Sequence, residues 1–273
     1  MITIGMPSYN NPKEVWFTVE ALRLYQDIKG CEILVLDNQG NEDTRKAARD
    51  CKVRYELFND VNGTGPARNK IFELANHPFV LVIDSHVLLY PDAIKNLKWW
   101  LSNNWNEAKN LIHGPLVLSA LVNSYTHYEN VWRKEMWGIW PKAVKPDDIP
   151  NEPFEIEMMG CGLFGCRKDS WLGFHKDCKG FDGVEGVIQE KYRKNGRKVL
   201  CLPFLKWVHK FGPSSGYPLR AEDKIRNFLL GFKEIDLDPS PIYEHFGQDK
   251  VAQIAKEIEW KTIAYRQPLY AGY

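Results

Sequence analysis

Short apolar runs alternate with amphipathic segments along the first 120 residues of the chain. The runs have the length and the β-branched content of buried strands, and they cover residues 2–9, 31–38, 53–59, 79–86 and 110–120. The segments between them have helical apolar spacing or begin with helix-start signals such as Asn11-Pro12, and they cover residues 11–28, 41–50, 62–76 and 91–104. This alternation predicts an α/β fold, a mainly parallel Rossmann-like sheet flanked by helices.

The second half of the chain is less regular. Residues 122–155 are rich in Trp, Tyr and Pro and weakly patterned, which indicates a long loop or insertion. The remaining segments comprise a strand-like stretch with four glycines, a helix, a strand and two amphipathic helices, at residues 156–174, 183–196, 198–212, 221–235 and 248–264. We therefore expect one domain over residues 1–212, and a C-terminal loop and helical extension, residues 213–273, packed on it.

Composition narrows the class of protein. The 273 residues are 44% hydrophobic and 26% charged with a net charge of +1, so no global basic field favours nucleic acid, although a local patch remains open. No apolar run approaches the roughly 18 residues of a membrane helix, and the N-terminus lacks the pattern of a signal peptide. The six cysteines form neither a CxxC pair nor a zinc-finger pattern, which favours reduced, buried thiols. We expect a cytoplasmic protein with no membrane partner.

Polar groups stand where several predicted strands end. Asp84 stops the apolar run 80–83 and His86 follows, Asp37 ends the second strand, and Pro7, Ser8 and Tyr9 end the first. Ligands of open α/β sheets bind at this edge. If the strand continues, alternation places Asp84 and His86 on one side, where a carboxylate and an imidazole suit a divalent cation such as manganese. A surface turn is the alternative.

Seven motifs in order resemble those of GT-A glycosyltransferases, most of all family 2 and the catalytic domain of polypeptide N-acetylgalactosaminyltransferases. They span residues 1–212 and read IGMPSYNN, ILVLDN, GPARNKIFELA, LVIDSH, GCGLFGCRKDSW, GFDGVEGVIQEKYRKNG and KWVHKFG. The resemblance implies a GT-A fold, a UDP-sugar donor, and Mn²⁺ or Mg²⁺ held by Asp84, His86 and His209.

The resemblance also implies roles around the donor. Asp37 would accept a hydrogen bond from the uracil, and Gly162 would let the donor sugar approach the backbone. Arg68 would pair with the phosphates or with Asp84, and an exposed helix arginine is the alternative. The residues that would line the nucleotide pocket are Pro7, Ser8 and Tyr9.

The acceptor side departs from both families, because this chain has Gly183-Val184-Glu185-Gly186. Matched to family 2, Glu185 is the general base of an inverting reaction. Matched to the other family, it contacts the donor sugar, so the stereochemical outcome stays open. Alternatively, Glu185 has no catalytic role and is an acidic residue favoured by the dipole at the start of a helix. Asp182 is the second candidate for the general base. Tyr217 and Arg220 would belong to a loop that closes over the donor, with Gly212 as a hinge.

The sequence thus predicts a metal-dependent glycosyltransferase that moves a sugar from a UDP-sugar to an acceptor hydroxyl. A sugar-nucleotide nucleotidyltransferase is the first alternative, but this chain lacks the Gly-rich loop that such enzymes carry after the first strand. A non-catalytic nucleotide-sugar-binding module is the second, and the presence of all three implied metal ligands argues against it. The acceptor is DNA, a glycan or a protein. Aromatic and basic residues at 125–150 would suit hydroxymethylated bases in viral DNA, which would place the enzyme in the cytoplasm of a bacterial or phage-infected cell. The same residues could equally stack on a sugar ring or pack on the core. The oligomeric state is open.

Overall fold

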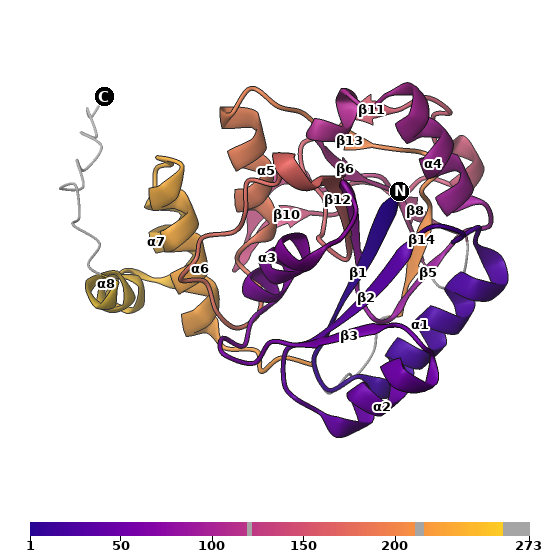
Figure 1. Ribbon diagram of the computed structural model, residues 1–273. Coiled ribbons are helices and arrows are strands. Elements are labelled where there is room, and N and C mark those ends of the chain that lie inside the picture. Colours follow the sequence, from indigo (N-terminus) through magenta and orange to yellow (C-terminus); the bar gives the residue numbers. More distant parts are fainter. Residues whose placement is uncertain (119–121, 211–215, 259–273) are drawn as a thin grey trace.

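The computed structural model describes residues 1–118, 122–210 and 216–258, and an eight-stranded sheet forms its centre (Figure 1). The strand order is β11-β13-β6-β12-β4-β1-β2-β3. In chain order, its strands are β1 (Ile2–Ser8), β2 (Glu32–Asp37), β3 (Arg54–Leu57), β4 (Phe79–Ile83), β6 (Leu111–His113), β11 (Phe154–Glu155), β12 (Leu163–Arg167) and β13 (Val199–Cys201). The sheet is mixed rather than purely parallel, because β12 runs antiparallel to both its neighbours and β11 runs antiparallel to β13.

Helices cover both faces of this sheet, as the alternating pattern predicts (Figure 1). They are α1 (Pro12–Tyr25), α2 (Glu42–Asp50), α3 (Thr64–Leu74), α4 (Ala93–Asn103) and α5 (Glu185–Lys194). Figure 1 shows α1, α2 and α4 on one side of the sheet and α3 and α5 on the other. Each strand from β1 to β4 is almost fully buried except β3 at the edge, which explains the continuous apolar runs.

A second sheet of four short strands, in the order β5-β14-β7-β8, lies beyond the end of the first. Its strands are β5 (Val87–Leu89), β7 (Leu116–Val117), β8 (Ser124–Tyr125) and β14 (Trp207–His209). The continuous strands predicted over residues 110–120 and 198–212 are therefore wrong, because each run divides between the two sheets. Gly114-Pro115 interrupts the first run and Pro203 the second, and proline has no N–H for a strand ladder.

Residues 122–155 are not a plain loop, because they contain a hairpin of β9 (Glu129–Arg133) and β10 (Met136–Ile139). Trp132 and Trp137 lie parallel, with ring centroids 5.7 Å apart. They pack against α6 (Ala221–Glu234) and α7 (Ser240–Phe246), through contacts that include Phe228 and His245. These two tryptophans therefore hold the C-terminal helices to the hairpin and are not free to stack on bases.

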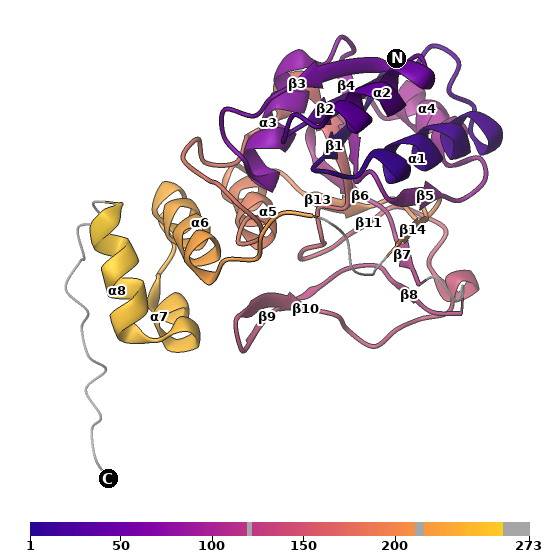
Figure 2. The same ribbon diagram turned by 90° about the horizontal axis from the view of Figure 1, so that it is seen from below.

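The C-terminal helices α6, α7 and α8 (Gln248–Glu257) lie together to one side of the central sheet (Figure 2). Their buried side chains form a second, smaller apolar cluster, which Val187 of α5 joins. Gly231 of α6 lies against Val187 of α5. A Cβ at Gly231 would come within 2.4 Å of the valine side chain, so glycine allows a close contact between the cluster and the main domain. The predicted boundary between residues 212 and 213 lies outside the described residues, and so does Gly212. The division into domain and extension stays a prediction.

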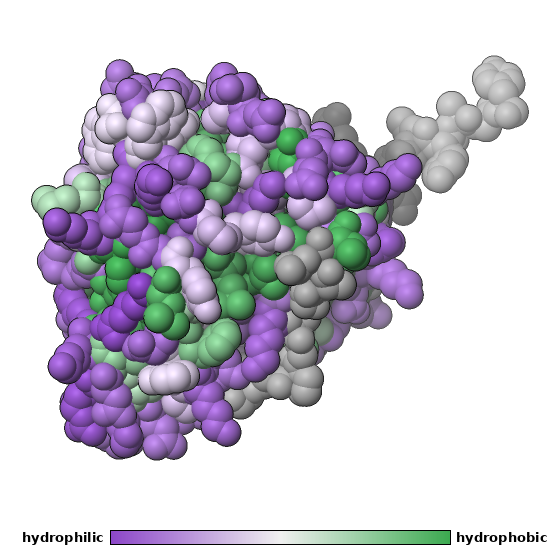
Figure 3. Space-filling view, turned by 90° about the vertical axis from the view of Figure 1, so that its right-hand side faces the viewer, coloured by the Kyte–Doolittle hydropathy of each residue, from purple (hydrophilic) through white to green (hydrophobic). Residues whose placement is uncertain are grey.

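One side of α1 is unusually apolar for a surface helix. Trp16, Phe17, Leu24 and Tyr25 are each more than half exposed, and a groove of about 380 Å³ separates this helix from β5. Figure 3 views the molecule from the side on which α1 lies, and apolar side chains are grouped there. Among the described residues, no helix has both the length and the apolar character needed to cross a membrane.

His113, at the end of β6, makes stability depend on pH. Its side chain is fully buried, Nδ1 donates to the carbonyl of Leu163 at 3.1 Å, and burial lowers its pKa to about 4. The unfolded chain takes up this proton below about pH 6.5, whereas the folded chain does so only near pH 4. We expect urea unfolding to show a loss of about 3 kcal/mol as pH falls through this window.

His113→Gln is expected to remove most of this pH dependence, whereas His77→Gln, at a half-buried position outside the core, is expected to keep it. Equal slopes for the wild type and His113→Gln would contradict the assignment.

Candidate active site at the carboxyl ends of the strands

Asp84, His86 and His209 come together at the junction of the two sheets. One ligand atom from each side chain lies within 4.8 Å of the others. Asp84 and His86 occupy a turn between β4 and β5, so strand alternation does not place them, and that part of the prediction is wrong. β14 supplies the third group, because its pairing with β5 puts His209 opposite Val87, the residue after His86.

The chemistry of this cluster fits a divalent cation. His86 Nε2 and His209 Nε2 face each other at 2.9 Å, and Asp84 Oδ2 lies 3.8 Å from His209 Nε2. Two ligand atoms that each lie about 2.1 Å from an ion and subtend a right angle at it are about 3 Å apart, close to the distance between the two Nε2 atoms. Burial lowers the pKa of His86, which favours the neutral imidazole that binds metals. A carboxylate oxygen and two imidazole nitrogens suit Mn²⁺ and similar ions.

Arg68 lies behind the cluster and is 4% exposed, so the interpretation as an exposed helix arginine is wrong. Its Nη2 donates to Asp84 Oδ1 at 3.2 Å, and its Nη1 is 3.8 Å from Glu185 Oε1. Burial alone would raise the pKa of Asp84, but Arg68 and the two histidines outweigh burial and hold that pKa well below its usual value. Asp84 is therefore ionised, and Arg68 joins the predicted metal site to the predicted base.

Gly162 lies beside Asp84, as the pairing of β12 with β4 requires. Its carbonyl accepts the backbone N–H of Asp84 at 2.9 Å. A Cβ at this position would stand 2.8 Å from the ring of Trp207 and 3.4 Å from Asp84 Oδ2. Only a glycine keeps this wall of the site flat.

A cavity of about 200 Å³ opens from the cluster toward the end of β1. Pro7 and Tyr9 line it, whereas Ser8 is buried and does not, and their role in binding a nucleotide stays a prediction. The Tyr217 ring stacks on Tyr9 with centroids 4.2 Å apart, and the Tyr217 hydroxyl donates to Asn38 Oδ1 at 2.5 Å. Tyr217 thus lies at the site, as expected for its loop, whereas Arg220 is exposed just before α6.

Asp37 ends β2 as predicted, but its side chain does not line the cavity. Oδ1 accepts backbone N–H groups of Gln39 and Gly40 at 3.0 Å, and Oδ2 accepts those of Asn41 at 2.8 Å and the hydroxyl of Tyr55 at 2.9 Å. Four hydrogen bonds fill the acceptor sites of a carboxylate. In this conformation Asp37 holds the loop after β2 in place. Neither of its oxygens is left to accept a hydrogen bond from the uracil of a nucleotide.

Glu185 and Asp182 stand at the start of α5 in different surroundings. Burial raises the pKa of Glu185, and the charge of Asp182 adds to this rise, against the opposing effect of Arg68. Asp182 Oδ2 pairs with Lys224 Nζ at 2.8 Å, and its Oδ1 accepts the N–H of Gly183. Glu185 therefore has the properties of a base that accepts a proton, whereas Asp182 is held as an ion pair.

Five residues that line the cavity were not predicted as site residues from the sequence, namely Asn11, Thr64, Ser85, Phe181 and Lys210. Thr64 begins α3, and its buried hydroxyl has no hydrogen-bond partner among the described residues. The glycine-rich turn NGTG before a predicted helix was a usable signal, because helix N-termini attract phosphate. Lys210 follows His209 and pairs with Glu14 at 3.2 Å.

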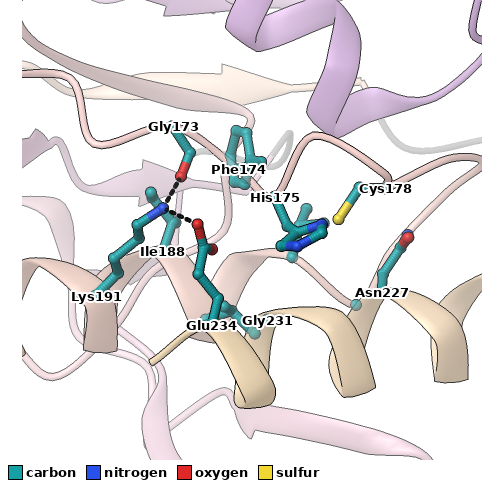
Figure 4. Close-up of a pocket in the computed structure, with 12 residues that line it drawn as sticks. Gly173, Phe174, His175, Cys178, Ile188, Lys191, Asn227, Gly231 and Glu234 are labelled. Atoms are coloured by element: carbon teal, nitrogen blue, oxygen red, sulfur yellow. Dashed lines mark hydrogen bonds and ion pairs between the residues drawn. The ribbon is translucent and has the colours of Figure 1, made fainter. Parts of the chain in front are cut away.

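A second hollow lies between α5, α6 and residues 173–178, and it is not a site of comparable size. It holds about 10 Å³, room for about one water molecule. Figure 4 shows Lys191 beside it, donating to the carbonyl of Gly173 and paired with Glu234, both at 2.8 Å. These contacts fasten α5 to α6.

Comparisons with known proteins agree with this geometry. Residues 3–114 match the model of glycosyl transferase family 2. A search of curated proteins finds no match. Two solved structures share the fold: GalNAc-T7 with UDP, GalNAc and Mn²⁺ (TM-score 0.65, 13% identity, 95% of this chain and 56% of that one), and the mannosyltransferase PcManGT from Pyrobaculum calidifontis with GDP-Man and Mn²⁺ (TM-score 0.55, 15% identity, 96% and 75%).

The chain thus spans little more than half the length of GalNAc-T7. The family match covers β1 to β6, including Asp84 and His86, and the fold match covers nearly the whole chain. The chain therefore has the GT-A fold that its motifs indicated, and residues 3–114 are similar to glycosyl transferase family 2.

Proposed function

We propose that this protein transfers a sugar from a UDP-sugar to an acceptor hydroxyl and requires a divalent cation, Mn²⁺ or Mg²⁺. The observation that carries the proposal is the cluster of Asp84, His86 and His209, with ligand atoms within 4.8 Å, at the mouth of the cavity lined by Tyr9 and Arg68. The solved structures of similar fold contain UDP or GDP-Man together with Mn²⁺, which supports a nucleotide-sugar donor.

The donor side is proposed from the charged groups around the cavity. When bound at Asp84, His86 and His209, a divalent ion supplies Lewis-acid stabilisation of the negative charge on the leaving diphosphate. Arg68 holds Asp84 ionised and in place, and Lys210 adds a second positive charge at the rim of the cavity. Pro7 and Tyr9 give the nucleotide a flat apolar surface to lie on.

The acceptor side rests on Glu185. Its carboxylate lies at the first turn of α5 with a raised pKa and accepts a proton from the attacking hydroxyl. Asp182 is paired with Lys224 Nζ at 2.8 Å and is the weaker candidate for this role. Inversion at the anomeric carbon is the outcome that this arrangement favours.

The acceptor itself is an alcohol from DNA, a glycan or a protein. The case for hydroxymethylated DNA is weaker in three dimensions, because Trp132 and Trp137 are used in packing α6 and α7. Arg133 and Lys134 at the turn of the hairpin keep their exposed positive charge. DNA with hydroxymethylated bases therefore stays in the acceptor panel beside glycans and peptides.

Removal of the metal tests the proposal directly. We expect purified protein with Mn²⁺ to release free nucleotide from one member of a panel of UDP-, GDP- and TDP-sugars, slowly with water as acceptor. EDTA is expected to stop the release and added Mn²⁺ to restore it, because the leaving diphosphate then loses or regains its counter-charge.

Calorimetry on the same samples provides the control. Binding of UDP only in the presence of Mn²⁺ supports the site even where turnover needs the true acceptor. Absence of both release and Mn²⁺-dependent nucleotide binding would refute the proposed function.

A further inference from the structure

Tyr128 is held firmly just before β9. Its backbone N–H donates to the carbonyl of Met158 at 2.6 Å. Its ring meets Trp140 edge-on, with centroids 4.2 Å apart, and lies against Gly138, where a Cβ would stand 3.1 Å from the tyrosine ring. These contacts fix the direction of the phenol hydroxyl.

The Tyr128 hydroxyl points to the bare backbone of Gly160. A Cβ at Gly160 would lie 2.7 Å from this oxygen. No described residue forms a hydrogen bond with the hydroxyl. Burial raises the pKa of Tyr128, and the nearby charge of Glu185 adds to that rise, so the hydroxyl keeps its proton. The side chain is half-buried, so its hydroxyl is a neutral, fixed donor that a ligand beside Gly160 could use.

The segment from Gly160 to Gly162 connects the two halves of the site. Gly162 lies beside Asp84, and Gly160 lies beneath the Tyr128 hydroxyl. Between them, the buried Cys161 thiol is close enough to Glu185, Arg68 and Asp84 for their charges to act on it. A sugar in transfer has its anomeric carbon between the diphosphate and the attacking hydroxyl. The backbone from Gly160 to Gly162 runs from the Tyr128 hydroxyl to Asp84, beside the expected position of the sugar.

We propose that the Tyr128 hydroxyl binds a hydroxyl group of the transferred sugar and so contributes to the choice of donor sugar. The inference rests on the proposed function and adds a residue to it. The sugar lies flat on Gly160 and Gly162, with the Tyr128 hydroxyl at one side and Glu185 beyond it. Any residue other than glycine at position 160 would place a side chain in the space that this contact needs.

Tyr128→Phe tests the contact, because it removes one oxygen and keeps the ring against Trp140. Calorimetry with Mn²⁺ compares UDP with the UDP-sugar that the wild type binds most tightly. We expect UDP affinity to stay the same and UDP-sugar affinity to fall about 3- to 10-fold, the range for one neutral hydrogen bond. Tyr125→Phe is the matched control, since the Tyr125 ring packs on the same Trp140 at 4.5 Å.

Gly160→Ala is the second variant, because its methyl group would press on the Tyr128 hydroxyl. It is expected to weaken the UDP-sugar and spare UDP, with an unchanged cooperative thermal transition. If Tyr128→Phe lowered the affinities for UDP and UDP-sugar equally, or changed neither, the role of Tyr128 would be overturned, and the proposed function would stand. Failure of the wild type to bind UDP and every UDP-sugar would overturn the proposed function as well.

Discussion

Asp84→Asn is expected to lower metal-dependent turnover of the UDP-sugar by about 10³-fold. The amide keeps the shape of the carboxylate and an oxygen for Arg68, but it loses the charge that attracts a divalent cation. The distance of 3.2 Å between Arg68 Nη2 and Asp84 Oδ1 indicates that the fold tolerates this change better than a truncation to alanine. Manganese titration calorimetry and nucleotide release are the measurements.

Asp92→Asn is the matched control, because Asp92 lies in the connection from β5 to α4 and forms only an exposed pair with Lys95 at 3.7 Å. It is expected to behave as the wild type does. An Asp84→Asn protein that binds Mn²⁺ and turns over the donor normally would show that the cluster is not the metal site.

Glu185→Gln is expected to reduce kcat by about 10²- to 10⁴-fold, the usual contribution of general base catalysis. Binding of UDP with Mn²⁺ is expected to stay unchanged, since Glu185 lies on the far side of Arg68 from the metal ligands. Because its pKa is raised above 4.5, the wild-type rate should fall as pH drops through that raised value, and the variant should lack this limb.

Glu190→Gln on the same helix is the control, since Glu190 contacts Arg193 at 2.7 Å and Asn130 at 3.2 Å, and none of these residues lines the cavity. A weaker UDP-sugar affinity with an undiminished rate at saturation would instead mean that Glu185 binds the sugar. That result would refute the role as base and favour retention of configuration.

Local pattern was sufficient for most elements of the first 110 residues, although it did not predict β5 of the second sheet. Buried strands such as β1 and β4 read as continuous apolar runs, and helix starts such as Asn11-Pro12 are local signals. The same reasoning failed for residues 110–120 and 198–212. A run that passes from one sheet to another has the same apolar character throughout, and only its partners reveal the break at Gly114 and Pro203.

For the site, the sequence by itself determined which chemical groups are present: the Asp84 and His86 pair at a strand end, the arginine of α3, the glycines near 160 and the acid at the start of α5. The tertiary structure decided their uses. Strand pairing over more than 120 residues of sequence brings His209 to His86. Hydrogen bonds from its own loop occupy Asp37, and packing on α6 occupies Trp137. Partners and burial depend on contacts between distant segments, which a local pattern does not encode.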